Sequence, residues 1–213
     1  MDNISIIIRN KNEAEYIGFA IQSCIEFFDN PEIIVLNNNS RDDSMDVVQN
    51  FNNRTSIITK NIDNYKPGKS INTGVQLCSN DYVLVMSGHT QIINLNFQKI
   101  KDQLETYKAI FGKQIPVFRG KKITPSYIWS NFSDKVEANK FSEIENRYFL
   151  HNAFCFYKKE GLLESPMPEE YSGKEDRFWA KEIIDKGYSY LYDPNQVAYH
   201  FWTKNGATWK GIV

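Results

Sequence analysis

Near its start the chain reads Ser5-Ile6-Ile7-Ile8-Arg9-Asn10-Lys11-Asn12-Glu13, an apolar run that passes directly into a polar segment. Three consecutive isoleucines without alternation are typical of a strand that is buried on both faces of a sheet. The apolar residues that follow recur at helical spacing: Ile17, Ala20, Ile21, Cys24 and Phe28. Asn12, with Glu15 three residues later, predicts the N-terminal cap of that helix. The stretch therefore predicts a strand, a polar turn and a helix, the first βα unit of an α/β fold.

The same alternation continues through the first half of the chain. Further apolar runs predict strands at Glu32–Leu36, Ser56–Thr59 and Tyr82–Met86. Between them, Arg41–Phe51 and Lys69–Cys78 predict helices that follow turn-forming residues. Strands that alternate with helices in this way predict a parallel sheet with crossover helices.

The second half of the chain is less regular. Phe97–Tyr107 and Glu175–Lys186 predict helices, and Ala153–Tyr157, Tyr188–Tyr192 and Val197–Phe201 predict strands. Residues 116–147 show no clear period. Because the composition changes little between the two halves, we expect residues 1–213 to form a single domain.

Composition excludes several classes of function. Lys and Arg number 25 against 26 Asp and Glu, so no overall field attracts nucleic acid or an anionic membrane. No window approaches the roughly 18 apolar residues that a transmembrane helix needs, and no targeting signal stands at the N-terminus. Three cysteines without a Cys-x-x-Cys pair predict neither a disulfide framework nor a zinc knuckle. We therefore expect a soluble, cytoplasmic protein.

Polar segments follow four of the predicted strands, at residues 9–13, 37–40, 64–69 and 87–89. In open α/β sheets, ligands bind beyond the carboxyl ends of the strands. Amides and hydroxyls there can hydrogen-bond a base and a ribose, while Arg9 and Lys69 can neutralise a diphosphate. Each segment taken alone is equally explained as a turn or a helix cap. Their collection at one sheet edge favours a nucleotide site, although no glycine-rich fingerprint of a dinucleotide fold or P-loop follows the first strand.

Blocks across nearly the whole chain resemble family 2 glycosyltransferases, which have the GT-A fold of nucleotide-diphospho-sugar transferases. Residues 5–13, Ile34–Ser40 and Pro67–Gly74 resemble successive blocks of that family, and Tyr82–His89 resembles the strand that ends in its Asp-x-Asp. Later blocks resemble a rhamnosyltransferase-like branch of polysaccharide biosynthesis: Phe111–Pro116, His151–Ala153, Gly173–Ala180 and Val197–His200. The resemblance implies a mostly parallel central sheet flanked by helices. It also implies a nucleotide-binding half of about residues 1–93 and an acceptor and catalytic half of about residues 94–213.

Together with the strand-end argument, the resemblance implies a nucleotide-sugar site that contains Arg9, Asn10, Glu13, Asn38, Lys69 and Ser87. Asn38 stands where the family commonly has an aspartate that accepts a hydrogen bond from a uracil imide. An amide oxygen can accept the same bond without carrying charge. We therefore favour a UDP-sugar as the donor and leave the preference for the base open.

Ser87-Gly88-His89 departs from the family pattern, because it stands where the metal-binding Asp-x-Asp would be. An imidazole is a poor ligand for Mg²⁺ but is acceptable to Mn²⁺. His89 and His200 are therefore the candidate ligands of a divalent metal, Mn²⁺, beside the diphosphate. The alternative is a hydrogen-bonded structural role for each histidine.

Glu175-Asp176 opens a predicted helix, where carboxylates can act structurally by complementing the helix dipole. The functional interpretation is a general base that takes the proton of an acceptor hydroxyl. The resemblance assigns this role to Asp176, gives Glu175 an orienting or acceptor-binding role, and implies inversion at the anomeric carbon. Trp179 beside the pair is the candidate aromatic platform for the acceptor. Asn152 is the candidate contact to the acceptor or the donor sugar.

The sequence thus predicts an inverting glycosyltransferase that moves rhamnose or another hexose from a nucleotide-diphosphate donor to a glycan acceptor. One alternative is a catalytically silent module that binds a nucleotide-sugar or a glycan, against which the Glu175-Asp176 pair argues. The other is a nucleotidyltransferase, whose glycine-rich basic loop is missing at Arg9–Glu13. Turnover of a donor separates the three, since a silent module releases no nucleotide and a nucleotidyltransferase releases pyrophosphate.

Overall fold

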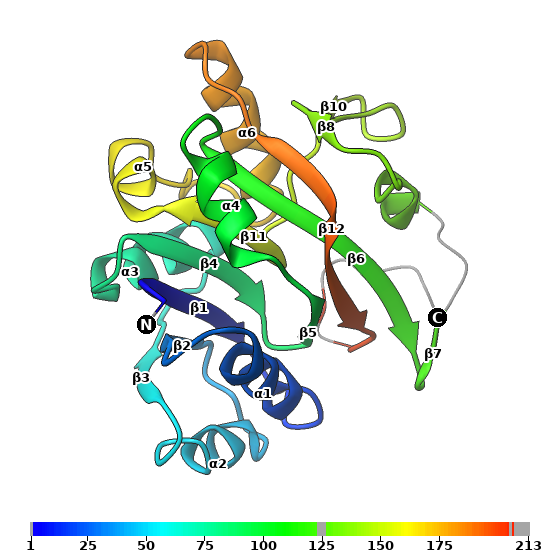
Figure 1. Cartoon of the computed structure of the whole chain (residues 1–213). Helices are drawn as coiled ribbons and strands as arrows, with labels where there is room; N and C mark the ends of the chain where they lie inside the picture. Colours follow the sequence, from blue (N-terminus) through cyan, green and yellow to red (C-terminus); the bar gives the residue numbers. More distant parts are fainter. Residues whose placement is uncertain (1, 123–126, 205, 207–213) are drawn as a thin grey trace.

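A computed structural model describes residues 2–122, 127–204 and 206 of the chain (Figure 1). Its centre is one mixed sheet with the strand order β3-β2-β1-β4-β11-β6-β12-β5. The strands on this path are β1 (Ile4–Asn10), β2 (Glu32–Asn37), β3 (Ser56–Asn61), β4 (Tyr82–Ser87), β5 (Thr90–Asn94), β6 (Ala109–Phe118), β11 (Phe154–Lys158) and β12 (Leu191–Phe201). The helices are α1 (Ile17–Phe27), α2 (Ser44–Gln49), α3 (Pro67–Leu77), α4 (Phe97–Leu104), α5 (Lys159–Glu164), α6 (Glu175–Asp185) and the short 3₁₀ helix η1 (Tyr127–Asn131).

The first half of the chain folds as the periodicity predicts. β3, β2, β1 and β4 pair in parallel, and the helices between them make the crossovers. Their order is that of a doubly wound nucleotide-binding unit, in which the carboxyl ends of all four strands reach the same edge. The predicted side-chain cap of α1 is wrong, because the helix begins after Tyr16 without a side-chain cap bond. Asn12 instead adopts a left-handed φ of 52° and accepts a hydrogen bond from the backbone N–H of Arg41.

The second half completes the same sheet and makes it mixed. β11 runs antiparallel to both of its neighbours, β4 and β6, whereas β12 runs parallel to β6. β5 forms an antiparallel edge against β12. Of the strand predicted at Tyr188–Tyr192, only the last two residues are strand, and they belong with the predicted Val197–Phe201 to the single strand β12. The register of β12 shifts between Asp193 and Val197.

β6 is a long internal strand that the sequence analysis did not predict. At Gly112 an added Cβ would lie 2.6 Å from the backbone oxygen of Gln196 and 2.6 Å from the ring of Phe154. Glycine therefore permits the close approach of β12 and β11 on the two sides of β6. Four short strands complete the description, β7 (Lys121–Lys122), β8 (Glu137–Ala138), β9 (Phe141–Ser142) and β10 (Arg147–Tyr148).

The hydrophobic core lies on both faces of the sheet. Ile7 packs into a cluster with residues of α3 and α6, while Ile6 and Ile8 pack into a second cluster with residues of α1 and α4. This division explains the uninterrupted isoleucine run, because successive side chains of β1 point to opposite and equally buried faces. Within the described ranges, no helix combines the length and the apolar content that a membrane crossing requires.

Candidate active site

A cavity of about 430 Å³ opens at the carboxyl ends of β1, β2 and β4. It brings together most of the residues that the sequence singles out: Arg9, Asn10, Glu13, Asn38, Ser87, His89, Glu175 and Asp176. The lining also includes residues that were not named as site candidates, among them Tyr65, Glu145, His151, Lys174 and Arg177. Ser87, His89 and the acidic pair, although far apart in sequence, therefore face one space.

Four predicted site residues do not line this cavity: Lys69, Trp179, Asn152 and His200. Lys69 is exposed on α3 and is absent from the cavity lining. Trp179 is only 1 % exposed, packs edge to face on Tyr157, and donates from Nε1 to the backbone oxygen of Ser165 at 2.7 Å. Its expected role as an acceptor platform is wrong, because its ring is enclosed in the core and offers no face to a sugar.

Asn152 contacts two residues that line the cavity, Arg9 and Asp176. Its backbone oxygen accepts from Arg9 Nη2 at 2.9 Å, and its backbone N–H donates to Asp176 Oδ2 at 3.0 Å. Its side-chain oxygen accepts from the hydroxyl of buried Tyr157. With 1 % exposure, Asn152 holds Arg9 and Asp176 in place and does not itself line the cavity.

Hydrogen bonds between neighbouring strand ends hold the part of the cavity that β1 and β2 form. Asn10 Nδ2 donates to the hydroxyls of Ser40 and Ser44, each at 3.1 Å. The backbone N–H of Asn38 donates to the oxygen of Asn10 at 2.8 Å, and Lys11 Nζ donates to the oxygen of Asn38 at 2.8 Å. These bonds join the ends of β1 and β2 and fix Asn38 at the cavity wall.

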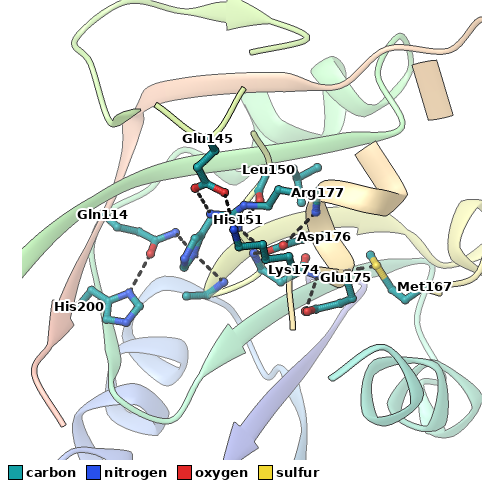
Figure 2. Close-up of polar contacts among 12 residues, drawn as sticks. Gln114, Glu145, Leu150, His151, Met167, Lys174, Glu175, Asp176, Arg177 and His200 are labelled. Atoms are coloured by element: carbon teal, nitrogen blue, oxygen red, sulfur yellow. Dashed lines mark hydrogen bonds and ion pairs between the residues drawn. The ribbon is translucent and has the colours of Figure 1, made fainter. Parts of the chain in front are cut away.

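Asp176 begins the first turn of α6 and is almost fully buried. Its Oδ2 accepts from the N–H of Asn152 and from Arg177 Nη1, and its Oδ1 accepts from the N–H of Arg177 (Figure 2). Burial alone raises the pKa of a carboxyl, but the charge of Arg177, with His151 and these bonds, holds the pKa of Asp176 below its ordinary value. A carboxylate has about four acceptor positions, and the bonds among the described residues use three of them. Asp176 is thus a fixed, ionised carboxylate with one acceptor position left on Oδ1.

Glu175 stands in a different environment from its neighbour. Its Oε1 accepts from Arg9 Nη1 at 3.2 Å and from Asn152 Nδ2 at 3.4 Å. Burial raises the pKa of Glu175, and the adjacent Asp176 carboxylate raises it further. The Arg9–Glu175 ion pair joins the end of β1 to the start of α6 across the cavity.

Arg177 is the centre of a buried charge network (Figure 2). It donates to Asp176 at 2.9 Å, to the backbone oxygen of Leu150 at 2.8 Å and to Glu145 at 3.2 Å. Its guanidinium also lies 4.4 Å from the centroid of the Phe149 ring. Arg177 thereby ties residues 145–150 to the start of α6.

The two candidate metal ligands meet at the inner wall of the cavity. His89 Nε2 lies 3.0 Å from His200 Nε2, and the outer nitrogen of each ring contacts an acceptor, Glu13 for His89 and Gln114 for His200. Burial lowers the pKa of His200 well below its ordinary value. Two imidazole nitrogens suit Mn²⁺ if oxygen ligands complete its coordination. The described residues contain no group of three or more His, Cys, Asp or Glu side chains that could hold a metal, so a donor diphosphate and water would have to supply those oxygens.

An aromatic pair that the sequence analysis missed lies beside the cavity. The rings of Tyr171 and Phe178 are stacked, with centroids 3.7 Å apart, and both side chains are partly exposed. They flank residues 172–174, which line the cavity, and Phe178 lies one helical turn beyond Glu175. This pair has the partial exposure that Trp179 lacks.

The doubly wound sheet and the polar cavity at its strand ends are those of the GT-A fold. Residues 5–164 match the model of Glycosyl transferase family 2, and the chain belongs to this family.

Relatives with known names agree with this class. Over 198 residues the chain is 27 % identical to GalNAc(5)-diNAcBac-PP-undecaprenol beta-1,3-glucosyltransferase of Campylobacter jejuni, a match that covers 88 % of the chain and 62 % of that protein. Residues 1–349 of S. aureus TarS in complex with UDP-GlcNAc superpose with a TM-score of 0.69 at 18 % identity, over 99 % of the chain and 61 % of TarS 1–349. The mannosyltransferase PcManGT of Pyrobaculum calidifontis in complex with GDP-Man and Mn²⁺ superposes with a TM-score of 0.67 at 16 % identity, over 96 % of the chain and 58 % of that structure. The chain thus spans about three fifths of the length of these proteins.

Proposed function

We propose that this chain transfers a hexose from a nucleoside-diphosphate sugar to a hydroxyl of a glycan acceptor, with inversion at the anomeric carbon. The observation that carries the proposal is that the strand ends of β1, β2 and β4 and the carboxylates of α6 line one cavity. A donor held by the strand ends would place its anomeric carbon between the nucleotide site and Asp176. One displacement at that carbon is then the simplest reaction.

The donor site is built from the ends of β1 and β2. Asn38, fixed by its backbone bond to Asn10, is the proposed contact to the base, and its amide oxygen favours a uracil imide. Arg9 and Lys11 line the same cavity and would neutralise the diphosphate. UDP-glucose is the first donor to test, since the Campylobacter relative is named a glucosyltransferase. A dTDP-linked rhamnose stays in the screen because of the sequence blocks that resemble rhamnosyltransferases.

Asp176 is the proposed general base. As the acceptor oxygen bonds to the anomeric carbon, its proton passes to Asp176 and the bond from that carbon to the diphosphate breaks. Asn152 and Arg177 hold the carboxylate in one orientation, which leaves Oδ1 for the acceptor hydroxyl. Arg9, which pairs with Glu175, would link the position of the diphosphate to that of the base.

A divalent cation, Mn²⁺ in our proposal, would be held by His89 and His200 and would supply positive charge to the departing diphosphate. The Tyr171–Phe178 stack is the proposed platform for the acceptor, since sugars pack their C–H faces on aromatic rings. The acceptor class that we propose is a glycan of polysaccharide or glycoprotein synthesis. A lipid-linked oligosaccharide is one such acceptor, as the name of the Campylobacter relative indicates for that protein.

The test is a calorimetric screen of UDP-, GDP-, dTDP- and CMP-linked sugars, followed by an assay of nucleotide release in the presence of glycan acceptors. We expect selective binding of one nucleotide-sugar and acceptor-dependent release of its nucleoside diphosphate. Binding without release would favour the catalytically silent module. Release of pyrophosphate in a parallel assay with nucleoside triphosphates and sugar 1-phosphates would favour a nucleotidyltransferase. No binding of any donor would contradict the transferase and would favour a silent module that binds a glycan.

A further inference from the structure

A single buried side chain, Gln114 of β6, connects the histidine pair to the catalytic end of the cavity. It is 1 % exposed, and its amide contacts His200 Nδ1 at 2.8 Å through Oε1 and His151 Nδ1 at 3.0 Å through Nε2 (Figure 2). The three residues come from β6, β12 and the segment before β11, which the sheet brings together. Gln114 is therefore placed to set the orientation of both rings.

The direction of the Gln114 amide follows from its surroundings. His151 Nδ1 also faces the backbone N–H of Ala153, at 3.4 Å, so this ring nitrogen is an acceptor. The amide NH₂ of Gln114 must then donate to His151, and its carbonyl oxygen must face His200. Because a carbonyl oxygen can only accept, His200 donates from Nδ1.

The same reasoning applies to His89 on the other side of the pair. Its Nδ1 lies 3.1 Å from the carboxylate of Glu13, which also favours donation from that nitrogen. With both Nδ1 atoms directed at acceptors, the Nε2 atoms of His89 and His200 face each other at 3.0 Å. Two ring nitrogens directed at each other in this way favour a cation at that position. Histidines that bind metals commonly donate their other N–H to a carboxylate or a carbonyl, as both rings do here.

We propose that Gln114 and Glu13 are positioning residues that direct Nε2 of His200 and of His89 at one divalent transition-metal ion. His89 lines the cavity, so the open coordination positions of the ion would face the diphosphate of the donor. The inference rests on the proposed function for the role of the ion during transfer. Binding of the ion to the protein does not require transfer and can be measured without it.

The experiment is a titration of the full chain with Mn²⁺, followed by the electron paramagnetic resonance signal of the free ion, with and without UDP. Gln114→Met removes both amide contacts, whereas Gln114→Glu keeps an acceptor for His200. The matched control is Gln196→Met, because Gln196 is also buried, contacts Asp193 and Asn96, and does not line the cavity. Loss of an outer partner of a metal ligand typically weakens metal binding about 10- to 100-fold.

We expect Gln114→Met to bind Mn²⁺ about 10- to 100-fold more weakly than wild type, with Gln114→Glu and Gln196→Met within about threefold of it. The proposal is overturned if wild type takes up no Mn²⁺ with or without UDP, in which case a proton alone joins the two rings. It is also overturned if Gln114→Met binds Mn²⁺ as tightly as wild type does, or if Gln114→Glu loses Mn²⁺ binding. The same holds if Gln196→Met weakens Mn²⁺ binding as much as Gln114→Met does. Binding of the donor, measured by calorimetry in the absence of metal, tests the proposed function independently of Mn²⁺ binding.

Discussion

The two ends of the cavity are held by different kinds of interaction. At the end formed by β1 and β2, the proposed nucleotide end, each hydrogen bond has at least one neutral partner, as where Asn10 donates to Ser40. At the end formed by the start of α6, the proposed catalytic end, buried charges meet, as where Arg177 binds Asp176 and Glu145. Loss of one neutral hydrogen bond costs about 1 kcal/mol, whereas removal of one partner from a buried ion pair costs about 3–5 kcal/mol.

The protein should therefore tolerate substitutions differently at the two ends. The proposed nucleotide end should accept substitutions with small changes in stability and moderate changes in donor binding. At the proposed catalytic end, a substitution should change stability and catalysis together, because the residues that orient Asp176 also fix residues 145–150. The following predictions test that contrast.

The largest effect should follow from Asp176→Asn. An amide cannot take the proton of the acceptor hydroxyl, so kcat should fall about 10²- to 10⁴-fold. The affinity for the donor should stay within about twofold, since the strand-end residues that bind it are unchanged. Asp185→Asn, an exposed change at the end of the same helix, is the control. A loss of donor binding equal to the loss of turnover would place Asp176 in the donor site and not in the chemical step.

Arg177→Met should lower the free energy of unfolding by about 3 kcal/mol, since it leaves Asp176 and Glu145 buried without their shared cation. Ser40→Ala at the other end, which removes an acceptor from the neutral donors Asn10 and Asn12, should lower it by about 1–2 kcal/mol. Lys181→Met, which breaks an exposed pair with Asp185, should change it by less than about 0.5 kcal/mol. Urea unfolding of the three variants measures the series. Equal losses of stability for Arg177→Met and Ser40→Ala would contradict the contrast between the two ends.

Asn38→Ala should weaken UDP binding about fivefold, the equivalent of one neutral hydrogen bond of about 1 kcal/mol. Lys69→Ala is the matched test of the sequence prediction, because Lys69 does not line the cavity. We expect it to leave the calorimetric affinity for UDP unchanged. A larger loss of UDP affinity from Lys69→Ala than from Asn38→Ala would mean that the donor lies outside this cavity.

The smallest effect should follow from Tyr171→Ala. Removing one ring of the stack should raise the KM for the acceptor about threefold to fivefold, in line with roughly 1 kcal/mol for an aromatic contact. The KM for the donor should not change. Initial rates at varied acceptor and donor concentrations separate the two KM values. A change in the KM for the donor alone would contradict the assignment of this stack to the acceptor site.

The sequence predicted that polar strand ends meet at one edge of the sheet, because the signals for this are local. Each strand of the first half is an apolar run, and each polar segment follows directly, so the strand order of a doubly wound unit brings residues 9–13, 37–40 and 87–89 to one edge. The four strands were placed within two residues of their observed ends.

The catalytic end could not be assembled in the same way. Arg9 and Glu175 are 166 positions apart, and Gln114 and His200 are 86 positions apart. No local sequence pattern can therefore indicate that these residues are in contact. β6 was missed because Gly112 and Pro116 interrupt its apolar pattern. Trp179 was named because it stands beside the acidic pair. Neighbouring helical residues point about 100° apart, and the sequence does not say whether Trp179 or Phe178 faces the core. The acidic pair was found because two carboxylates at a helix start are a local signal.

The central claim is that the donor and the base share one cavity and that the sugar is transferred in one displacement. The most direct test is the anomeric configuration of the product, read by proton NMR after reaction of an α-linked nucleotide-sugar. We predict a β-linked product, formed by wild type and lost in Asp176→Asn. An α-linked product would contradict direct displacement, since retention requires a different arrangement of groups around the anomeric carbon.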